Sequence, residues 1–287
     1  MLIAIHFEEE EDCKALYDQF EYYFQKFSMI GLGGSIMIDD TCSLLIEYKQ
    51  KDVDFYEAFH PFIVSILTDY VIDSQEEEWL LDIIETMFYF QDEEEKRQIV
   101  SIANAILEGD RKELPRVNDL MNRRSLIYEA FATHLEEETD FYYEPFLTFR
   151  LREYGECLID CVELAIDEYM LEQEYQNMIE GFRHYVQDHK AKMEIIYLIH
   201  NESFTFLDEQ FRKLTRDELM FYLNDDIVFE QEVEIEEMVI SPLVSMLPKS
   251  VHIFSDDPDH GVIMSIQSIF QERLHVYPLK MYEKEWR

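Results

Sequence analysis

Residues that interrupt helices are scarce in this chain, which has 7 glycines and 7 prolines among 287 residues. Glycine and proline dominate tight turns and are disfavoured inside helices, so their scarcity favours long helices and few hairpins. It also weakens any fold built on glycine-rich phosphate loops. From about residue 51 to residue 190, apolar side chains recur at helical spacing almost throughout.

This middle region divides into several predicted helices. The periodicity places them at residues 52–72, 75–90, 92–108, 122–138 and 145–190. We expect the last helix to be broken near Gln173 or Gly181. Residues 74–77 (Ser-Gln-Glu-Glu) match a capping box with acidic side chains in the first turn, and Gly109 is expected to end a helix as its C-cap.

The two ends of the chain contain short β-rich runs. Residues 1–50 are expected to form a strand, an acidic helix and a β-hairpin around Asp39, a β-α-β-β order. Residues 191–287 alternate strands (194–200, 203–207, 251–254, 274–278) with helices (232–247, 261–273), which favours some parallel pairing.

The expected fold class is therefore α+β and mostly helical, with a helical region at residues 51–190 between two β-containing segments. One alternative joins residues 1–50 and 191–287 in one sheet, with the helical region as an insertion. The other alternative separates a helical domain from a C-terminal α/β domain. The sequence leaves both arrangements open.

Acidic residues far outnumber basic ones, 63 against 24, for a formal net charge of −39. Proteins that bind nucleic acids or anionic membranes neutralise phosphates with Lys and Arg, so we expect neither kind of partner. The remaining explanations are a solvated surface, a basic protein partner, bound cations or adaptation to high salt.

The sequence is typical of a cytoplasmic protein with reduced thiols. The start of the chain has a short apolar run followed by acidic residues rather than a basic segment, and no apolar run approaches the roughly 20 residues that span a bilayer. The cysteines are Cys13, Cys42, Cys157 and Cys161. Cys157 and Cys161 share a helix face, but no second pair has metal-ligand spacing, so we expect small buried side chains rather than a zinc site.

Other short motifs give equally little support for catalysis, and none calls for a cofactor. The glycine cluster at residues 31–34 lacks the remainder of a dinucleotide or P-loop fingerprint. Glu57 and His60 match one Glu-x-x-His element of a di-iron bundle, but it occurs once and Pro61 follows it. His134 and Glu138 form one helical pair, which is more typical of a surface contact.

An acidic loop at residues 255–261 is the best local candidate for a cation site. It follows a predicted strand and precedes a predicted helix, where α/β sheets usually bind ligands. Asp256, Asp257, Asp259 and His260 could hold Mg²⁺ or another hard cation. The same residue types also form turns and cap helices, so a purely structural role is the alternative.

The predicted helix at residues 145–190 has an apolar stripe and an acidic face. The stripe steps by three and four residues through Leu151, Tyr154, Leu158, Val162, Ala165 and Tyr169. The acidic face contains Glu153, Glu156, Asp160, Glu163 and Asp167. Arg150 and Arg152 lie near its N-terminal end, where the helix dipole disfavours cations, so they should pair with carboxylates such as Glu156. The arginines and the Asp167–Glu168 pair need a further explanation.

This region resembles the YtxC-like family of sporulation proteins from endospore-forming bacteria. The residues that carry the resemblance are Phe149, Arg150, Leu151, Tyr154, Ala165, Asp167, Glu168, Glu174 and Tyr175. The resemblance implies a role connected with sporulation, and it brings no catalytic residues with it. We therefore treat Arg150, Arg152, Tyr154, Asp167 and Glu168 as a candidate functional cluster.

Two hypotheses follow. The first is a non-enzymatic cytoplasmic protein of the sporulation programme, which acts through protein contacts and uses its acidic surface to bind a basic partner. The second is a cation-dependent enzyme or metal-binding protein that uses Asp256, Asp257, Asp259 and His260. The sequence indicates neither an oligomeric state nor a substrate.

Overall fold

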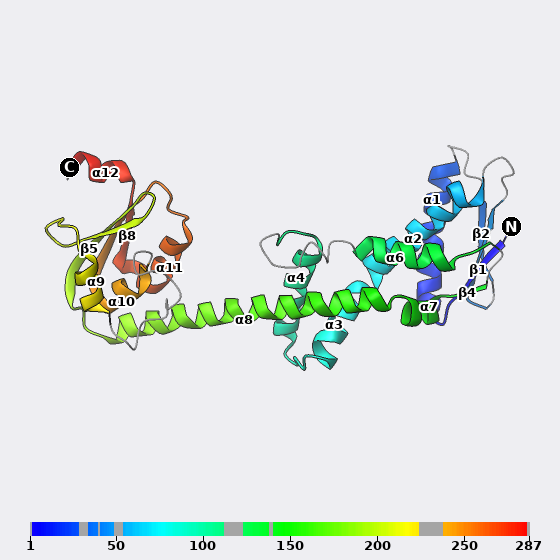
Figure 1. The fold of residues 1–287 in the computed structure, drawn as a ribbon, viewed down its shortest axis with the longest axis horizontal. Coiled ribbons are helices and arrows are strands. Elements are labelled where there is room, and N and C mark those ends of the chain that lie inside the picture. The colour runs from blue at the N-terminus through cyan, green and yellow to red at the C-terminus, as the bar shows by residue number, and fades with distance from the viewer. Residues whose placement is uncertain are drawn as a thin grey trace. The chain divides into compact units, whose positions relative to one another are not determined.

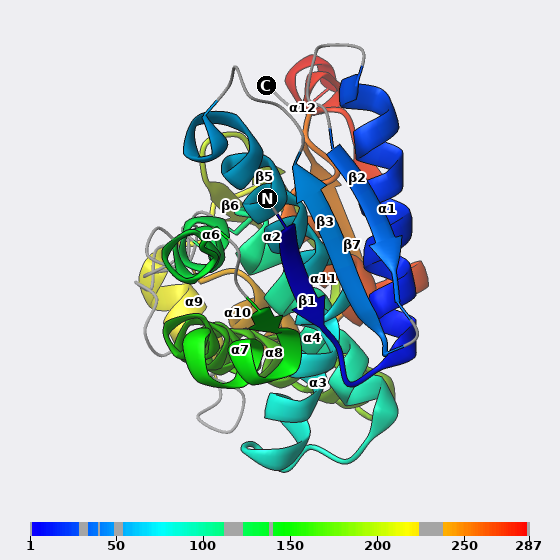
Figure 2. The same cartoon turned by 90° about the vertical axis from the view of Figure 1, so that its right-hand side faces the viewer.

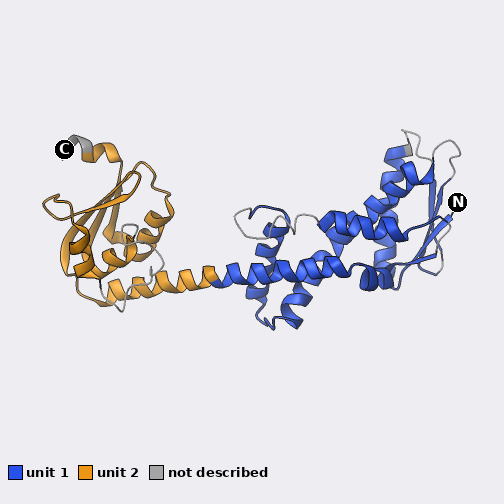
Figure 3. Cartoon of the chain, in the orientation of Figure 1, with its two compact units in different colours: residues 1–170 blue, residues 171–287 orange. Residues whose placement is uncertain are grey.

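A computed structural model describes residues 2–28, 34–39, 41–48, 54–111, 123–137, 140–223 and 238–285. The chain divides into two compact units, Met1–Met170 and Leu171–Arg287 (Figure 3). Each unit has its own sheet and its own hydrophobic core. The predicted α+β class with mostly helical content is confirmed (Figure 1).

The sheet of unit 1 has the strand order β2-β3-β1-β4. Its strands are β1 (Leu2–His6), β2 (Gly34–Ile38), β3 (Ser43–Tyr48) and β4 (Asp140–Tyr142). Helix α1 (Glu10–Ser28) follows β1 and packs beside the β2-β3 hairpin (Figure 2). The predicted strand-helix-hairpin order is therefore confirmed. Strand β4, which pairs parallel with β1, was not predicted, because its three residues are too short to show a period of two.

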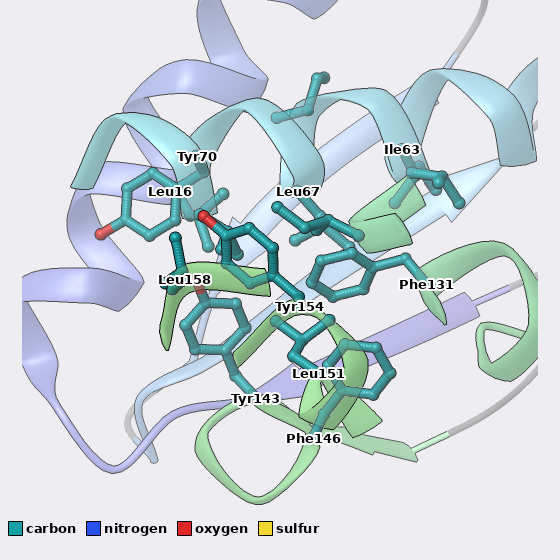
Figure 4. Packing of buried hydrophobic residues seen from close by; sticks show 14 of the residues in the cluster. Leu16, Ile63, Leu67, Tyr70, Phe131, Tyr143, Phe146, Leu151, Tyr154 and Leu158 are labelled. Atoms are coloured by element: carbon teal, nitrogen blue, oxygen red, sulfur yellow. The ribbon is translucent and has the colours of Figure 1, made fainter. Parts of the chain in front are cut away.

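The helices of unit 1 build one continuous core with this sheet. They are α2 (His60–Ser74), α3 (Glu76–Thr86), α4 (Glu93–Leu107), α6 (Arg123–His134), α7 (Tyr143–Arg150) and the first half of α8 (Arg152–Asp188). Figure 4 shows side chains from α1, α2, α6, α7 and α8 meeting in this core. A π-helical segment, Phe55–Phe59, leads into α2 and places Pro61 in its first turn, where proline is tolerated.

The predicted helix over residues 145–190 proved to be two helices, with the break in a different place. The backbone leaves helical geometry at Leu151 (φ −95°, ψ 26°), and α8 then continues through Gln173 and Gly181. The prediction of a break near those two residues was wrong. Ile179 and Phe182 are buried on either side of Gly181, and burying them outweighs the roughly 1 kcal/mol that a glycine costs inside a helix.

The capping box predicted at residues 74–77 was also wrong. Ser74 is the last residue of α2, and its hydroxyl donates to the carbonyl of Tyr70 at 2.6 Å. Gln75 precedes α3 without a side-chain cap, and Glu76 is buried instead of lying in a solvated first turn. Gly109, in contrast, follows α4 with a φ of 81°, in agreement with its predicted C-cap role.

The sheet of unit 2 has the order β6-β5-β7-β8. Its strands are β5 (Met193–His200), β6 (Phe204–Leu207), β7 (Pro248–Phe254) and β8 (Leu274–Tyr277). The predicted parallel pairing is present between β5 and β7 and between β7 and β8. This sheet is separate from that of unit 1, so the alternative in which residues 1–50 and 191–287 share one sheet does not hold.

Several helices complete unit 2. They are α9 (Arg216–Tyr222), α10 (Ile240–Met246), α11 (Gly261–Phe270), the short 3₁₀ segment Gln271–Arg273 and α12 (Leu279–Glu285). Helices α9 and α12 were not predicted. The division between the units falls after Met170 within α8, earlier than the predicted boundary at residue 190, because the end of α8 packs on the second core through Ile179, Phe182 and Val186.

Some sequence-based predictions fall outside the described residues: the glycines at residues 31–33, Asp40, Glu138 and the helix start at residues 232–237. In the described part of the chain, no helix is both long enough and apolar enough to cross a lipid bilayer.

Candidate functional site

An open groove of about 880 Å³ lies in unit 1 between α3, α7 and the start of α8. Its apolar lining consists of Trp79, Ile83, Leu147, Phe149, Leu151, Leu158 and Ile159. Phe149 is the most unusual of these, since 75% of it is exposed to solvent. An exposed aromatic side chain beside other apolar groups is a feature of binding surfaces.

The spacing of the side chains along α3 and α8 explains how the groove forms. Gln75, just before α3, and Trp79 and Ile83 within it are four residues apart and face the groove, while Leu80 and Ile84 lie in the core. Leu151, just before α8, and Gly155 and Ile159 within it are also four residues apart and form the facing wall. Helix α7 ends at the break at Leu151 and contributes the third side through Leu147 and Phe149.

Charged groups at the groove are mostly acidic. Arg152 donates to Glu156 at 3.1 Å, as the sequence predicted, and both side chains are exposed. Glu144 accepts a hydrogen bond from the backbone of Glu8 at 2.9 Å, and its other oxygen is buried with no partner among the described residues. Asp82 is an exposed acid on the α3 side. The lining therefore has a net negative charge.

A buried polar network lies directly behind the groove. The Tyr154 hydroxyl donates to one carboxylate oxygen of Glu76, and the other oxygen is 3.2 Å from the guanidinium of Arg123. Tyr154 and Glu76 are both buried, and the ring of Trp79 meets that of Tyr154 edge-on at 5.9 Å. The network thus ties α3, α6 and α8 together and positions Trp79 in the groove wall.

Burial dominates the electrostatics of this network. It raises the pKa of Glu76, an effect that the Tyr154 hydrogen bond and the Arg123 charge partly oppose. Burial and the Glu76 charge raise the pKa of Tyr154. Burial also raises the pKa of the Cys157 thiol to about 11 and that of Cys161 to about 12, so neither is an activated nucleophile. The arrangement supports structure and binding more readily than catalysis.

The structure separates the residues of the candidate functional cluster. Arg150 is exposed at the end of α7, Arg152 lines the groove and Tyr154 belongs to the buried network. Asp167 and Glu168 lie farther along α8, about 20 Å from Tyr154 at 1.5 Å per residue. Asp167 is exposed, and Glu168 lies 4.0 Å from Arg111. Of the five residues of the cluster, only Arg152 lines the groove, and Tyr154 contacts the groove residue Trp79 from the buried network.

Comparison with known proteins identifies the family. A sequence profile of the YtxC-like family matches residues 61–275, which include the groove and the network behind it. The chain belongs to the YtxC-like family. It is similar to the uncharacterized protein YtxC of Bacillus subtilis (strain 168), with 34% identity over 249 residues that cover 85% of this chain and 88% of the relative. No solved structure matches the chain.

The acidic loop of this YtxC-like protein lies in unit 2, after β7. Asp256 accepts a hydrogen bond from the backbone of Leu279 at 3.1 Å, at the start of α12. His260 caps α11 by accepting from the backbone of Val262 at 3.3 Å. Among the described residues, no group of three or more His, Cys, Asp or Glu side chains is placed to hold a metal ion.

The cation hypothesis for this loop remains a prediction. Calorimetric titration with Mg²⁺, Mn²⁺ and Zn²⁺ tests it, with an Asp256→Ala/Asp257→Ala variant as the comparison. Heat that the variant abolishes would support a site. Heat that is absent, or that is the same in the variant, would contradict it.

Sequence reasoning missed three residues that shape this YtxC-like site: Glu76, Trp79 and Arg123. A signal for Glu76 was present, because Glu76, Leu80 and Ile84 are four residues apart and are the buried positions of α3. An acid on an apolar stripe indicates a buried partner. Arg123 carried no such signal, since its proximity to Glu76 depends on how α6 packs.

Proposed function

We propose that this YtxC-like protein acts in the cytoplasm during sporulation, without catalysis, by binding a partner protein through the groove between α3, α7 and α8. We propose the cellular role because the chain resembles sporulation proteins, and we propose the contact surface because of the groove. The observation that carries the proposal is the exposure of Phe149 in a mainly apolar groove, whose lining residues Phe149 and Leu151 also belong to the residues that carry the family resemblance.

Three features support a binding role over an enzymatic one. The groove is lined mainly by apolar side chains, as protein-binding grooves are. The Tyr154 hydroxyl and the Glu76 carboxylate are hydrogen-bonded to each other and buried behind the groove wall, where a substrate would not reach them. The thiols of Cys157 and Cys161 have raised pKa values and are buried.

The cellular part of the proposal is tested by complementation. A Bacillus subtilis strain that lacks the relative is provided with this chain, and heat-resistant spores are counted. We expect the deletion to lower or delay spore formation and this chain to restore it at least in part. Normal spore yield and timing in the deletion strain would contradict a sporulation role.

The contact part is tested with a Phe149→Ser variant, which removes the exposed aromatic ring. Phe221 on α9 offers a matched control, because it is 85% exposed and lies outside the groove. In affinity capture from sporulating cells at low salt, we expect a partner that binds wild type and Phe221→Ser but not Phe149→Ser. Equal capture by all three proteins would exclude the groove as the contact surface.

A further inference from the structure

We infer that the groove between α3, α7 and α8 takes one amphipathic helix of the partner, with basic side chains beside its apolar face. This inference rests on the proposed function, since it names the kind of partner that the groove would bind.

The walls have the dimensions of a site for a short helix. The stretch from Gln75, just before α3, to Ile83 and the stretch from Leu151, just before α8, to Ile159 each extend over about 12 Å, at about 1.5 Å per residue. This distance equals a little over two helical turns. Two helices that present apolar side chains along such a length offer the groove into which a third helix packs, with contacts at its positions i, i+3, i+4 and i+7.

The space at Gly155 fits the same occupant. Apart from its chain neighbours and the backbone of its own helix, a Cβ atom placed on Gly155 would have no described heavy atom within 4 Å, so the α8 wall is open at its middle. Trp79 and Phe149 stand elsewhere along the lining and offer large apolar surfaces to the incoming helix. A glycine in a wall lets the backbone of a partner helix approach closely.

The negative charge of the groove lining favours a partner helix that has basic side chains beside its apolar face. Among the described residues that line the groove, Arg152 is the only cation, and it is paired with Glu156. Asp82 and Glu144 have no cationic partner among the described residues and leave two negative charges at the groove. An acidic helix would be repelled here, and the net charge of −39 would add to that repulsion at low salt.

Trp79 supplies a direct readout, because it is one of 2 tryptophans and lines the groove. In a Trp286→Phe background, Trp79 is the sole tryptophan. The probe is a synthetic helical peptide of about 14 residues, with Leu on one face and Lys on the other. The matched peptide has Glu in place of every Lys. We expect the Lys peptide to cause a saturable blue shift of Trp79 emission, with a Kd at least about tenfold lower than that of the Glu peptide.

The chain offers a well-matched pair of variants. Gly155→Phe fills the groove, whereas Gly181→Phe puts the same side chain into the same helix, in the other unit, at a position that is equally open. Both variants should fold, since neither new side chain meets a neighbouring atom at its Cβ. We expect Gly155→Phe to weaken binding of the Lys peptide at least about tenfold and Gly181→Phe to leave it unchanged.

Each result bears on the inference. A saturable shift that Gly155→Phe abolishes supports a helix in the groove, while equal binding of the Lys and Glu peptides overturns the basic character of that helix. Absence of a saturable shift, or equal binding by both glycine variants, overturns the site itself. Complementation separates the two proposals, because full spore yield with Gly155→Phe would reject the groove but leave the sporulation role intact.

Discussion

The carboxylate of Glu76 is buried, and both of its oxygens have partners: the Tyr154 hydroxyl and the Arg123 guanidinium. An ionised group away from water is stable only when its hydrogen-bonding capacity is met. The network therefore constrains three helices at once. It also explains how an acid is accommodated on the buried stripe of α3.

Removing one hydroxyl from this network should be costly. Tyr154→Phe keeps the ring packed but leaves one Glu76 oxygen without its donor, so we expect the free energy of unfolding to fall by about 1.5–3 kcal/mol. Urea unfolding followed by Trp79 fluorescence in a Trp286→Phe background measures it. Tyr89→Phe is the control, because Tyr89 is 77% exposed. A loss no larger than that of the control would show that the hydrogen bond contributes nothing to stability.

His200 in unit 2 gives a pH-dependent prediction. It is buried, hydrogen-bonds Ser255 at 2.9 Å and lies against the rings of Phe204 and His260. Burial, reinforced by His260 and opposed by Asp257, lowers the pKa of His200 below 6.5. The unfolded chain then binds the proton more readily than the folded chain does. The contribution of His200 to the free energy of unfolding is therefore fully present above pH 6.5, and it is lost as the pH falls through the pKa that His200 has in the folded chain.

We therefore expect the free energy of unfolding to rise as the pH increases from about 5 to 7. In a His200→Gln variant, the free energy of unfolding should rise less steeply with pH over this range. Denaturant titrations at several pH values measure it. His189→Gln is the matched control, because His189 is an exposed histidine just after α8. An unchanged slope in His200→Gln would mean that His200 does not titrate differently on folding.

At the scale of helices and strands, local sequence patterns predicted whether a segment is a helix or a strand better than they predicted where that segment begins and ends. The stripe from Leu151 to Tyr169 predicted a helix correctly, because periodicity reports which face is buried. The same stripe did not reveal the break at Leu151, since a one-residue departure from helical geometry leaves the spacing intact. Helix α9 has a true capping box, Thr215 with Glu218, but it is too short for periodicity to show.

Two glycines test the corrected helix boundaries. Gly181 lies inside α8 in open space, so Gly181→Ala should raise the free energy of unfolding by about 0.5–1 kcal/mol. Gly109 has a φ of 81°, so Gly109→Ala should lower it by about 1–2 kcal/mol. Urea unfolding of both variants measures the contrast. Destabilisation by Gly181→Ala would contradict a continuous helix at that position.

In the candidate site, contacts within one helix could be predicted from the sequence, whereas contacts between helices could not. Arg152 and its partner Glu156 were predictable from sequence, because both lie within one helical turn. The meeting of Trp79 with Leu147 and Gly155 was not, because it depends on how α3 packs against α7 and α8, which come much later in the sequence. Asp167 and Glu168 follow the motif in sequence yet lie several turns away along α8, so closeness in sequence overstated their closeness in space.

At the scale of the whole molecule, each unit holds its own core while the acidic residues are spread along the chain. Many of the acidic side chains have local partners: Asp92 caps α4, and Glu85 and Glu93 pair with the buried Lys96. Ion pairs between exposed side chains, such as Arg152 with Glu156, contribute little individually. The excess of negative charge therefore remains as a repulsion that folding must overcome.

Salt should weaken that repulsion and stabilise the fold. The screening length falls from about 30 Å at 0.01 M salt to about 3 Å at 1 M, so distant like charges cease to interact. We expect the melting temperature to rise by several degrees between dilute buffer and molar KCl, about 2–4 °C for each kcal/mol gained. Calorimetry in a KCl series measures it. An equal melting temperature at both extremes of KCl would show that the net charge of −39 is balanced locally and does not oppose folding.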